Sequence, residues 1–120
     1  MKILKLLIVS CLVIFYAQFS NAQAPVKKES FKVYGNCGMC KKTIEASAKA
    51  AGVAYANWNT KTKQLSISYD PEVTTTAKVE EAIANSGYDT PDFNGNDSAY
   101  NLLHECCKYE RKQTANTKNN

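Results

Sequence analysis

Val33 to Glu45 read VYGNCGMCKKTIE, and this stretch decides the fold. It has the pattern of a strand end, a tight loop containing glycine, and the first turn of a helix. Cys37 and Cys40 stand in the loop with two residues between them, so their sulfurs can meet at one metal ion or close on each other. A helix N-terminus also favours the thiolate, the form that binds metal or attacks disulfides.

The chain has 120 residues and a formal net charge of +4. Its length predicts one small domain with appendages. The charge is mild, and the sequence has no cluster of lysine and arginine interleaved with aromatic residues, so we expect no nucleic-acid partner. No Ser/His/Asp arrangement is visible, and His104 is the only histidine, so we expect a protein that is not an enzyme.

Residues 1–22 have the pattern of a secretory signal peptide. Two lysines precede an apolar run, and residues 20–22 offer a small-x-small site with cleavage before Gln23. We therefore expect an exported protein, periplasmic if the source is a Gram-negative bacterium, whose mature form does not span a membrane. The alternatives are a lipoprotein site at Cys11 and a retained membrane helix, although a helix that crosses the bilayer needs about 20 apolar residues and this run is shorter.

The mature chain keeps an even number of cysteines, namely Cys37, Cys40, Cys106 and Cys107. Structural disulfides are the plain alternative for an exported chain. However, a disulfide within the CxxC loop closes so small a ring that it removes little chain entropy. Two thiolates on an exposed loop, with no histidine or carboxylate nearby in sequence, fit better a site of low coordination number for a soft ion such as copper(I) or zinc.

Hydrophobic periodicity predicts an α+β domain over residues 31–91, after a linker at 23–30. Strands are expected at 31–34, 53–59, 64–69 and 88–90. One helix follows the cysteines and stops at Gly52, and another runs from an N-cap at Thr74 to Gly87. This order gives a ferredoxin-like βαββαβ fold, with a four-stranded antiparallel sheet and both helices on one face.

Residues 92–112 form a C-terminal extension with its own predicted helix, from Ala99 to about Arg111. An apolar stripe at helical spacing should dock this helix on the open face of the sheet, and the stripe consists of Ala99, Leu102, Leu103 and Cys106. The far turn of the helix could then bring a thiolate towards the CxxC loop. Residues 113–120 are polar and are predicted to be disordered.

The extension holds a second group of candidate ligands, namely Cys106, Cys107 and His104. Cys106 continues the apolar stripe and fits a buried core position. Cys107 falls three residues after His104, on a neighbouring face of the predicted helix. The group is therefore either an accessory set of metal ligands or one buried cysteine beside an incidental one.

Residues 31–90 resemble the heavy-metal-associated domain family. The matching pieces surround the two cysteines and the ends of the expected elements: Cys37-x-x-Cys40 followed by Ile44-Glu45, then Gly52-Val53, Tyr69-Asp70-Pro71, Ala82-Ile83 and Gly87-Tyr88. The family often has Gly-Met-x before the first cysteine. This chain has Tyr34-Gly35-Asn36 there, and its methionine, Met39, lies between the cysteines.

The resemblance implies that Cys37 and Cys40 are the ligands of a soft ion and that the ring of Tyr88 lies near the metal loop. Copper(I) is the first expectation, and mercury(II), zinc and cadmium are the alternatives. Members of this kind, which include exported mercury-binding proteins, act as metallochaperones or scavengers. The expected partner is a metal transporter, either a P-type ATPase or a membrane importer, or another metal-binding domain that takes the ion by thiolate exchange.

A thiol–disulfide oxidoreductase is the alternative function, because the CxxC stretch at 37–40 also resembles a thioredoxin active site. Against this alternative, a thioredoxin needs a strand–helix–strand unit before its cysteines, and residues 23–30 are too few to supply one. The sequence therefore predicts a metal-binding protein of ferredoxin-like fold.

Overall fold

The computed structural model describes residues 1–16 and 25–112. Helix α1 spans Lys2–Tyr16, inside the predicted signal peptide. The predicted cleavage site at 20–22 and the end predicted to be disordered, 113–120, lie outside the described residues. Of the helices in the described ranges, none is both long enough and apolar enough to cross a bilayer.

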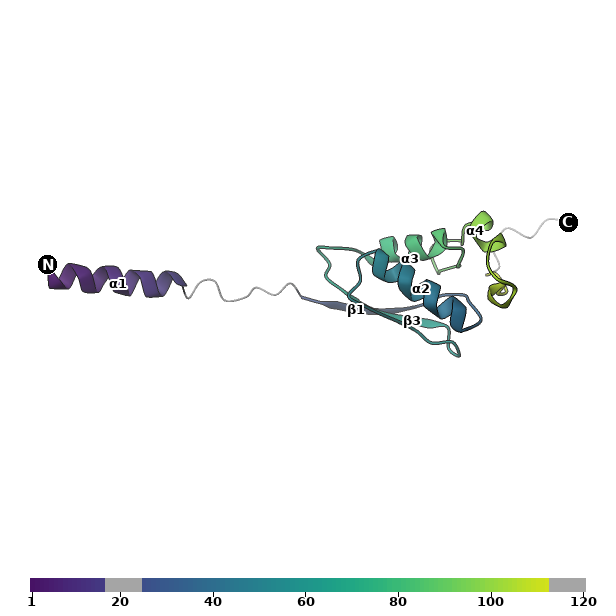
Figure 1. Cartoon of the computed structure of the whole chain (residues 1–120), viewed down its shortest axis with the longest axis horizontal. Helices are drawn as coiled ribbons and strands as arrows, with labels where there is room; N and C mark the ends of the chain where they lie inside the picture. Colours follow the sequence, from purple (N-terminus) through teal and green to yellow (C-terminus); the bar gives the residue numbers. More distant parts are fainter. Residues whose placement is uncertain (17–24, 113–120) are drawn as a thin grey trace.

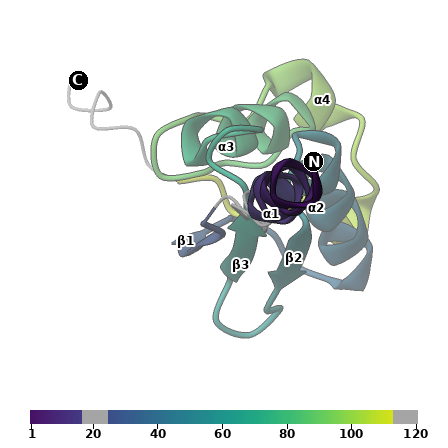
Figure 2. The same ribbon diagram turned by 90° about the vertical axis from the view of Figure 1, so that its left-hand side faces the viewer.

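Three antiparallel strands form one sheet, in which β3 (Gln64–Tyr69) lies between β1 (Lys27–Lys32) and β2 (Tyr55–Trp58). Figure 2 shows these strands side by side under the helices. In the register, Phe31 of β1 stands opposite Leu65 of β3. The alternation along β3 is clear, because every second residue of the strand is buried.

β1 begins earlier than the strand predicted at 31–34. Lys27 and Lys28 already pair with Tyr69 and Ser68 of β3. Backbone pairing therefore continues into a stretch whose exposed, mostly polar side chains gave no alternating apolar signal.

Helices α2 (Gly38–Ala50) and α3 (Thr76–Asn85) cover one face of the sheet (Figures 1 and 2). Each helix turns an apolar stripe towards the sheet, and the buried residues of these stripes include Ile44, Ala48, Val79 and Ile83. The predicted α+β arrangement, with both helices on one face of an antiparallel sheet, is therefore confirmed for the strands that form.

The glycines predicted to end the two helices do follow them, whereas the N-cap of α3 is one residue later than predicted. The N-cap of α3 is Thr75, whose hydroxyl accepts a hydrogen bond from the Lys78 N–H at 3.2 Å, whereas the predicted cap, Thr74, is buried. After each helix the chain passes through a glycine with positive φ, 105° at Gly52 and 100° at Gly87.

The core between sheet and helices centres on Trp58, which is fully buried. Its indole N–H donates to the Val33 carbonyl at 3.0 Å. Gly35 crosses the ring so closely that a Cβ there would lie 3.1 Å from the indole carbons. The loop that carries the two cysteines is therefore seated directly on the core.

The predicted fourth strand at 88–90 does not form in the described part of the chain, which has three strands where four were predicted. The segment does run beside the end of β1, where the Tyr34 N–H donates to the Asp89 carbonyl at 3.0 Å. However, the Asp89 N–H donates to the Tyr109 hydroxyl at 2.9 Å, and the Thr90 N–H bonds within its own turn. These N–H groups are therefore not free to extend a β ladder.

Residues 96–112, called the tail below, differ most from the prediction. They contain a short helix, α4 (Asp97–Asn101), and a 3-10 turn, η2 (Glu105–Cys107), in place of one helix over 99–111. The Asn96 side chain caps α4 by accepting the Ala99 N–H at 2.9 Å. After α4 the chain makes tight backbone bonds of the i to i+3 type, which end the helix.

The tail also does not dock on the open face of the sheet, and of the predicted apolar stripe only Leu103 is among the residues that pack against the core. The Leu102 side chain is 86% exposed. The tail instead lies at the end of α3 and beside the start of α2 (Figure 1), where the Asn96 N–H donates to the Ala84 carbonyl at 2.8 Å. Hydrogen bonds and tyrosine packing fix this position.

Candidate metal centre

The start of α2 positions Cys37 and Cys40. Cys37 is the N-cap residue, and its carbonyl accepts the Lys41 N–H at 3.0 Å. Cys40 lies in the first helical turn and is fully buried, and its sulfur accepts the Asn36 N–H at 3.5 Å. The half-buried Cys37 and the buried Cys40 thus present their sulfurs at the same end of the helix.

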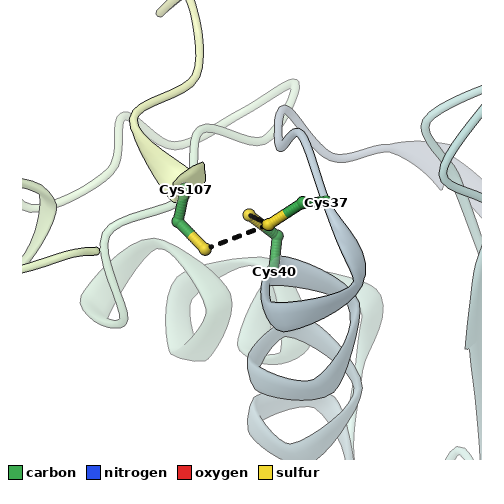
Figure 3. A group of neighbouring side chains, drawn as sticks. All are labelled: Cys37, Cys40 and Cys107. Carbon is green, nitrogen blue, oxygen red and sulfur yellow. Dashed lines mark hydrogen bonds between the residues drawn. The ribbon is translucent and has the colours of Figure 1, made fainter. Parts of the chain in front are cut away.

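A third sulfur joins this pair from the tail. The Sγ of Cys37 lies 3.6 Å from the Sγ of Cys40 and 3.5 Å from the Sγ of Cys107. All three sulfurs lie within 4.8 Å of one another. Figure 3 shows the Cys107 side chain pointing from the tail towards the start of α2, where Cys37 and Cys40 lie. We call these three atoms the sulfur cluster; the cysteines are free, since a disulfide needs a sulfur–sulfur distance of about 2.0 Å.

Cys106 lies at the rim of the sulfur cluster. It is exposed, and its Sγ lies 3.5 Å from that of Cys37 and 3.9 Å from that of Cys107. Its thiol donates to the Met39 sulfur at 3.5 Å, and Met39 is itself partly exposed. One of the two interpretations drawn from the sequence made Cys106 the buried member of the pair. The structure buries Cys107 instead, because a 3-10 turn, not an α-helix, sets their directions.

His104 is not among the grouped ligand atoms. It is exposed, and its backbone carbonyl accepts the Cys107 N–H at 2.8 Å, which closes the 3-10 turn. The accessory group predicted from the sequence therefore divides into one residue inside the sulfur cluster, one at its rim, and one that shapes the backbone.

The thiols of the cluster differ in acidity. The backbone N–H of Cys40 lowers the pKa of the Cys37 thiol to about 6, with smaller contributions from the neighbouring thiols. Burial raises the pKa of the Cys107 thiol well above its usual range, and the sulfurs of Cys40 and Cys37 raise it further. The Cys37 thiol therefore loses its proton more readily than an ordinary cysteine.

Tyr88 lies against the sulfur cluster and is fully buried. Burial raises the pKa of its phenol far above the usual range, and the sulfurs of Cys40 and Cys107 act in the same direction. Among the described residues, its hydroxyl has no hydrogen-bond partner. A protonated donor is thus held beside two thiol sulfurs with which it makes no well-aligned hydrogen bond.

Tyr109 anchors the tail next to the cluster. Its hydroxyl donates to the Gly87 carbonyl at 2.7 Å and accepts the Asp89 N–H at 2.9 Å. Its ring stacks on that of Tyr88, with centroids 5.7 Å apart, and meets the edge of Tyr100 at 5.2 Å. Nothing in the spacing of Tyr100 and Tyr109 in the sequence indicates this shared contact.

Asp89 and Arg111 form a second anchor. The carboxylate is almost fully buried, and it accepts bonds from Arg111 at 2.8 and 3.2 Å and from the Gly95 and Lys112 N–H groups at 2.6 and 2.9 Å. Burial alone would raise the pKa of Asp89, but Arg111 and these N–H groups lower it below its usual value. The pair joins residues 22 positions apart, and no local pattern predicts it.

Comparison with known proteins identifies the family. The model of the heavy-metal-associated domain matches residues 32–89. A solved structure of the CopZ metallochaperone is 32% identical, with a TM-score of 0.51, and the match covers 53% of this chain and 98% of that one. A comparison with curated protein sequences gives no match.

Two structures from Bacillus subtilis are also similar. The Cu(I)-loaded N-terminal domain of a potential copper-translocating P-type ATPase is 26% identical, with a TM-score of 0.52, and covers 55% of this chain and 85% of its own. The water-soluble region of the P-type ATPase CopA is 34% identical, with a TM-score of 0.53, over 57% of this chain and 46% of its own. With the CxxC loop at the start of α2 and the αβ layers described above, the chain belongs to the heavy-metal-associated domain family.

Proposed function

We propose that this protein binds a thiophilic metal ion, copper(I) in the first place, between Cys37 and Cys40 and passes it to another protein. The observation that carries the proposal is the pair of free thiols 3.6 Å apart at the N-terminus of a helix. One of these thiols has a pKa of about 6, so a soft, charged ligand is ready at neutral pH. Mercury(II), zinc and cadmium are the alternative cargoes.

Family membership supports binding and transfer over catalysis. The similar structures include a metallochaperone and a P-type ATPase domain in its Cu(I)-loaded state. A metal transporter of the ATPase type, or another metal-binding domain, is therefore the partner we propose. The fold and the family do not favour the thiol–disulfide oxidoreductase, which the CxxC motif alone left open.

Transfer follows from ligand exchange. A thiolate of the partner forms a bond to the bound ion, one of the original sulfur bonds then breaks, and the freed sulfur takes up a proton. Cys37 suits this exchange because its side chain is only half-buried, whereas Cys40 is fully buried. The ion keeps its oxidation state throughout, so no electron donor is required.

We further propose that the protein is exported, with residues 1–22 removed, which would place it in the periplasm of a Gram-negative source. The support is the sequence pattern of a basic start, an apolar run and a small-x-small site.

The test of metal binding uses Cys37→Ser and Cys40→Ser in the full chain. Both variants should lose copper(I) affinity by orders of magnitude, measured by competition with a copper(I) chelator, because each removes a ligand. Met39→Leu is the matched control, since it changes the same loop without removing a thiol. Native mass spectrometry of the reduced protein with copper(I), zinc and mercury(II) ranks the ions. Unchanged affinity in both serine variants would refute the assignment.

A further inference from the structure

We propose that Cys107 is a third thiolate ligand, brought to the ion by the folded tail, so that the loaded site is three-coordinate. The proposal rests on the proposed function, because it adds a ligand to the same ion. It separates this chain from a carrier whose ligands all come from the CxxC loop. It also assigns the tail a role in holding the metal.

The sulfur–sulfur distances fit three-coordination. With metal–sulfur bonds of about 2.3 Å, two sulfurs on opposite sides of an ion stand about 4.6 Å apart, and three in a planar triangle stand about 4 Å apart. The Sγ of Cys37 lies 3.6 Å from that of Cys40 and 3.5 Å from that of Cys107. The Cys40 and Cys107 sulfurs also lie within 4.8 Å of each other, so small shifts reach the triangle, whereas a linear pair would need the CxxC sulfurs to separate by about 1 Å.

The position of Cys107 is built into the fold. Its side chain is 3% exposed, and its backbone N–H is held by the His104 carbonyl. On its other side, the Lys108 carbonyl accepts the Asn36 side-chain N–H at 3.2 Å, which ties the tail directly to the CxxC loop. Tyr109, two residues after Cys107, is fixed by the hydrogen bonds of its hydroxyl and by the stacking of its ring. The Cys107 thiol is therefore already in position before an ion binds, so binding costs little conformational entropy there.

The hydroxyl of Tyr88 is a second, independent observation. Buried donors without a partner are rare in proteins. This one is fully buried and makes no well-aligned hydrogen bond among the described residues, although the thiols of Cys40 and Cys107, which are weak acceptors, lie close to it. Thiolate sulfurs accept hydrogen bonds, so binding of the ion by both cysteines would supply the missing acceptor.

Three thiolates around a monovalent ion leave a net negative charge, which is costly to bury. Three features offset that cost. The N-terminus of α2 points at the cluster; Tyr88 can donate to its buried side; and Cys37 keeps part of the site open to solvent. The charge is thus stabilised where it is buried and solvated where it is not.

A third ligand changes how the ion leaves. The thiolate of the partner forms a bond to the ion, the bond to Cys107 breaks, and the Cys107 sulfur takes up a proton while the ion remains copper(I). Because the tail holds Cys107 near the ion after the bond breaks, rebinding competes with transfer. We therefore expect slower release to a partner than from a chain that binds with the CxxC pair alone.

X-ray absorption on the reduced full chain, loaded with an equimolar amount of copper(I), tests the proposal. The wild type should show three sulfur neighbours and Cys107→Ser should show two. In chelator competition, Cys107→Ser should bind at least about tenfold more weakly, since even groups that only orient a ligand contribute about 10- to 100-fold to affinity. Cys106→Ser is the matched control, because it removes the adjacent, exposed thiol; it should keep three sulfurs and the wild-type affinity.

Arg111→Gln provides a second line of evidence that leaves every cysteine in place. It should shift the copper(I) affinity in the same direction as Cys107→Ser, because it loosens the tail at Asp89. Two sulfurs in the wild type overturn the proposal, even if Cys107→Ser fails to fold. Three sulfurs that fall to two in Cys106→Ser overturn it as well. If the wild type takes up no copper(I), the proposed function itself has failed.

Discussion

At the scale of single residues, the four cysteines at the candidate site differ in burial. Cys40 and Cys107 are buried, Cys37 is half-buried and Cys106 is exposed. The pKa of the Cys37 thiol is lowered, and the nearby backbone N–H of Cys40 is the largest cause. An ion can therefore meet an available thiolate first and reach the buried sulfurs afterwards. The CxxC motif alone predicts the two ligands but not this order.

Tyr88→Phe and Tyr109→Phe test the two buried hydroxyls of the site against each other. Loss of the Tyr88 hydroxyl should change the free energy of unfolding of the apo protein by less than about 1 kcal/mol, because this group makes no bond there. Loss of the Tyr109 hydroxyl should cost about 1–3 kcal/mol, because it leaves the Gly87 carbonyl and the Asp89 N–H unpaired.

Chemical denaturation of the metal-free proteins measures both values. Equal losses for the two variants would contradict the roles assigned to the hydroxyls. With copper(I) bound, Tyr88→Phe should also show weaker affinity than the wild type, because its donor would then be in use.

At the scale of elements, the sequence predicted what periodicity can indicate. The strand at 64–69 and the buried stripes of α2 and α3 are where the alternating and helical patterns place them. The first strand and the tail were predicted less well. β1 starts in a polar stretch, and the tail is held by contacts between residues distant in sequence, such as Asp89 with Arg111. Neither feature leaves a periodic trace in the sequence.

The same limit applies to the candidate site. Its two loop ligands follow from the CxxC spacing, but the burial of Cys107 depends on a 3-10 turn. The apolar stripe suggested a continuous helix, and an α-helical continuation would have buried Cys106 instead. Asn96 as N-cap and the short bonds after Asn101 decide against that helix. The prediction that a tail thiol approaches the CxxC loop is confirmed. The prediction that a continuous helix on the open face of the sheet brings it there was wrong.

The Asp89–Arg111 anchor predicts a pH dependence of stability. The pKa of Asp89 is lowered in the folded protein, so its contribution is fully present above the unfolded value of about 3.9 and is lost as the pH falls through that value towards the folded pKa. Asp89→Asn should therefore reduce stability near neutral pH and flatten the loss of stability below about pH 4. Glu45, whose pKa is also lowered, should keep part of the slope.

Asp97→Asn is the matched control for this experiment, because Asp97 also pairs with Arg111 but its side chain is 89% exposed. An exposed ion pair contributes little, so the stability of this variant should follow that of the wild type at every pH. Unfolding by denaturant at a series of pH values compares the three proteins. The same slope in wild type and Asp89→Asn would rule out Asp89 as the source.

At the scale of the whole molecule, we predict that the protein is exported. Expression of the full chain in a Gram-negative bacterium should yield a periplasmic protein whose N-terminal residue is Gln23, because the small-x-small site precedes that residue. Mass spectrometry of the purified protein measures where the chain begins. Ala22→Leu is the control that should block cleavage, since the site needs a small residue there. Recovery of the wild type with residues 1–22 intact, or with a lipid on Cys11, would contradict the prediction.

The sulfur cluster joins residues that are 70 positions apart in the chain. Cys37 and Cys40 therefore emerge from the ribosome or a translocation channel well before Cys107. A partly emerged chain has only part of the sulfur cluster available to bind an ion. Loss of residues 96–112 would likewise return the protein to the incomplete state without touching the CxxC loop. For the proposed three-thiolate site, the synthesis of the tail thus sets the time at which the chain can hold an ion with all of its ligands.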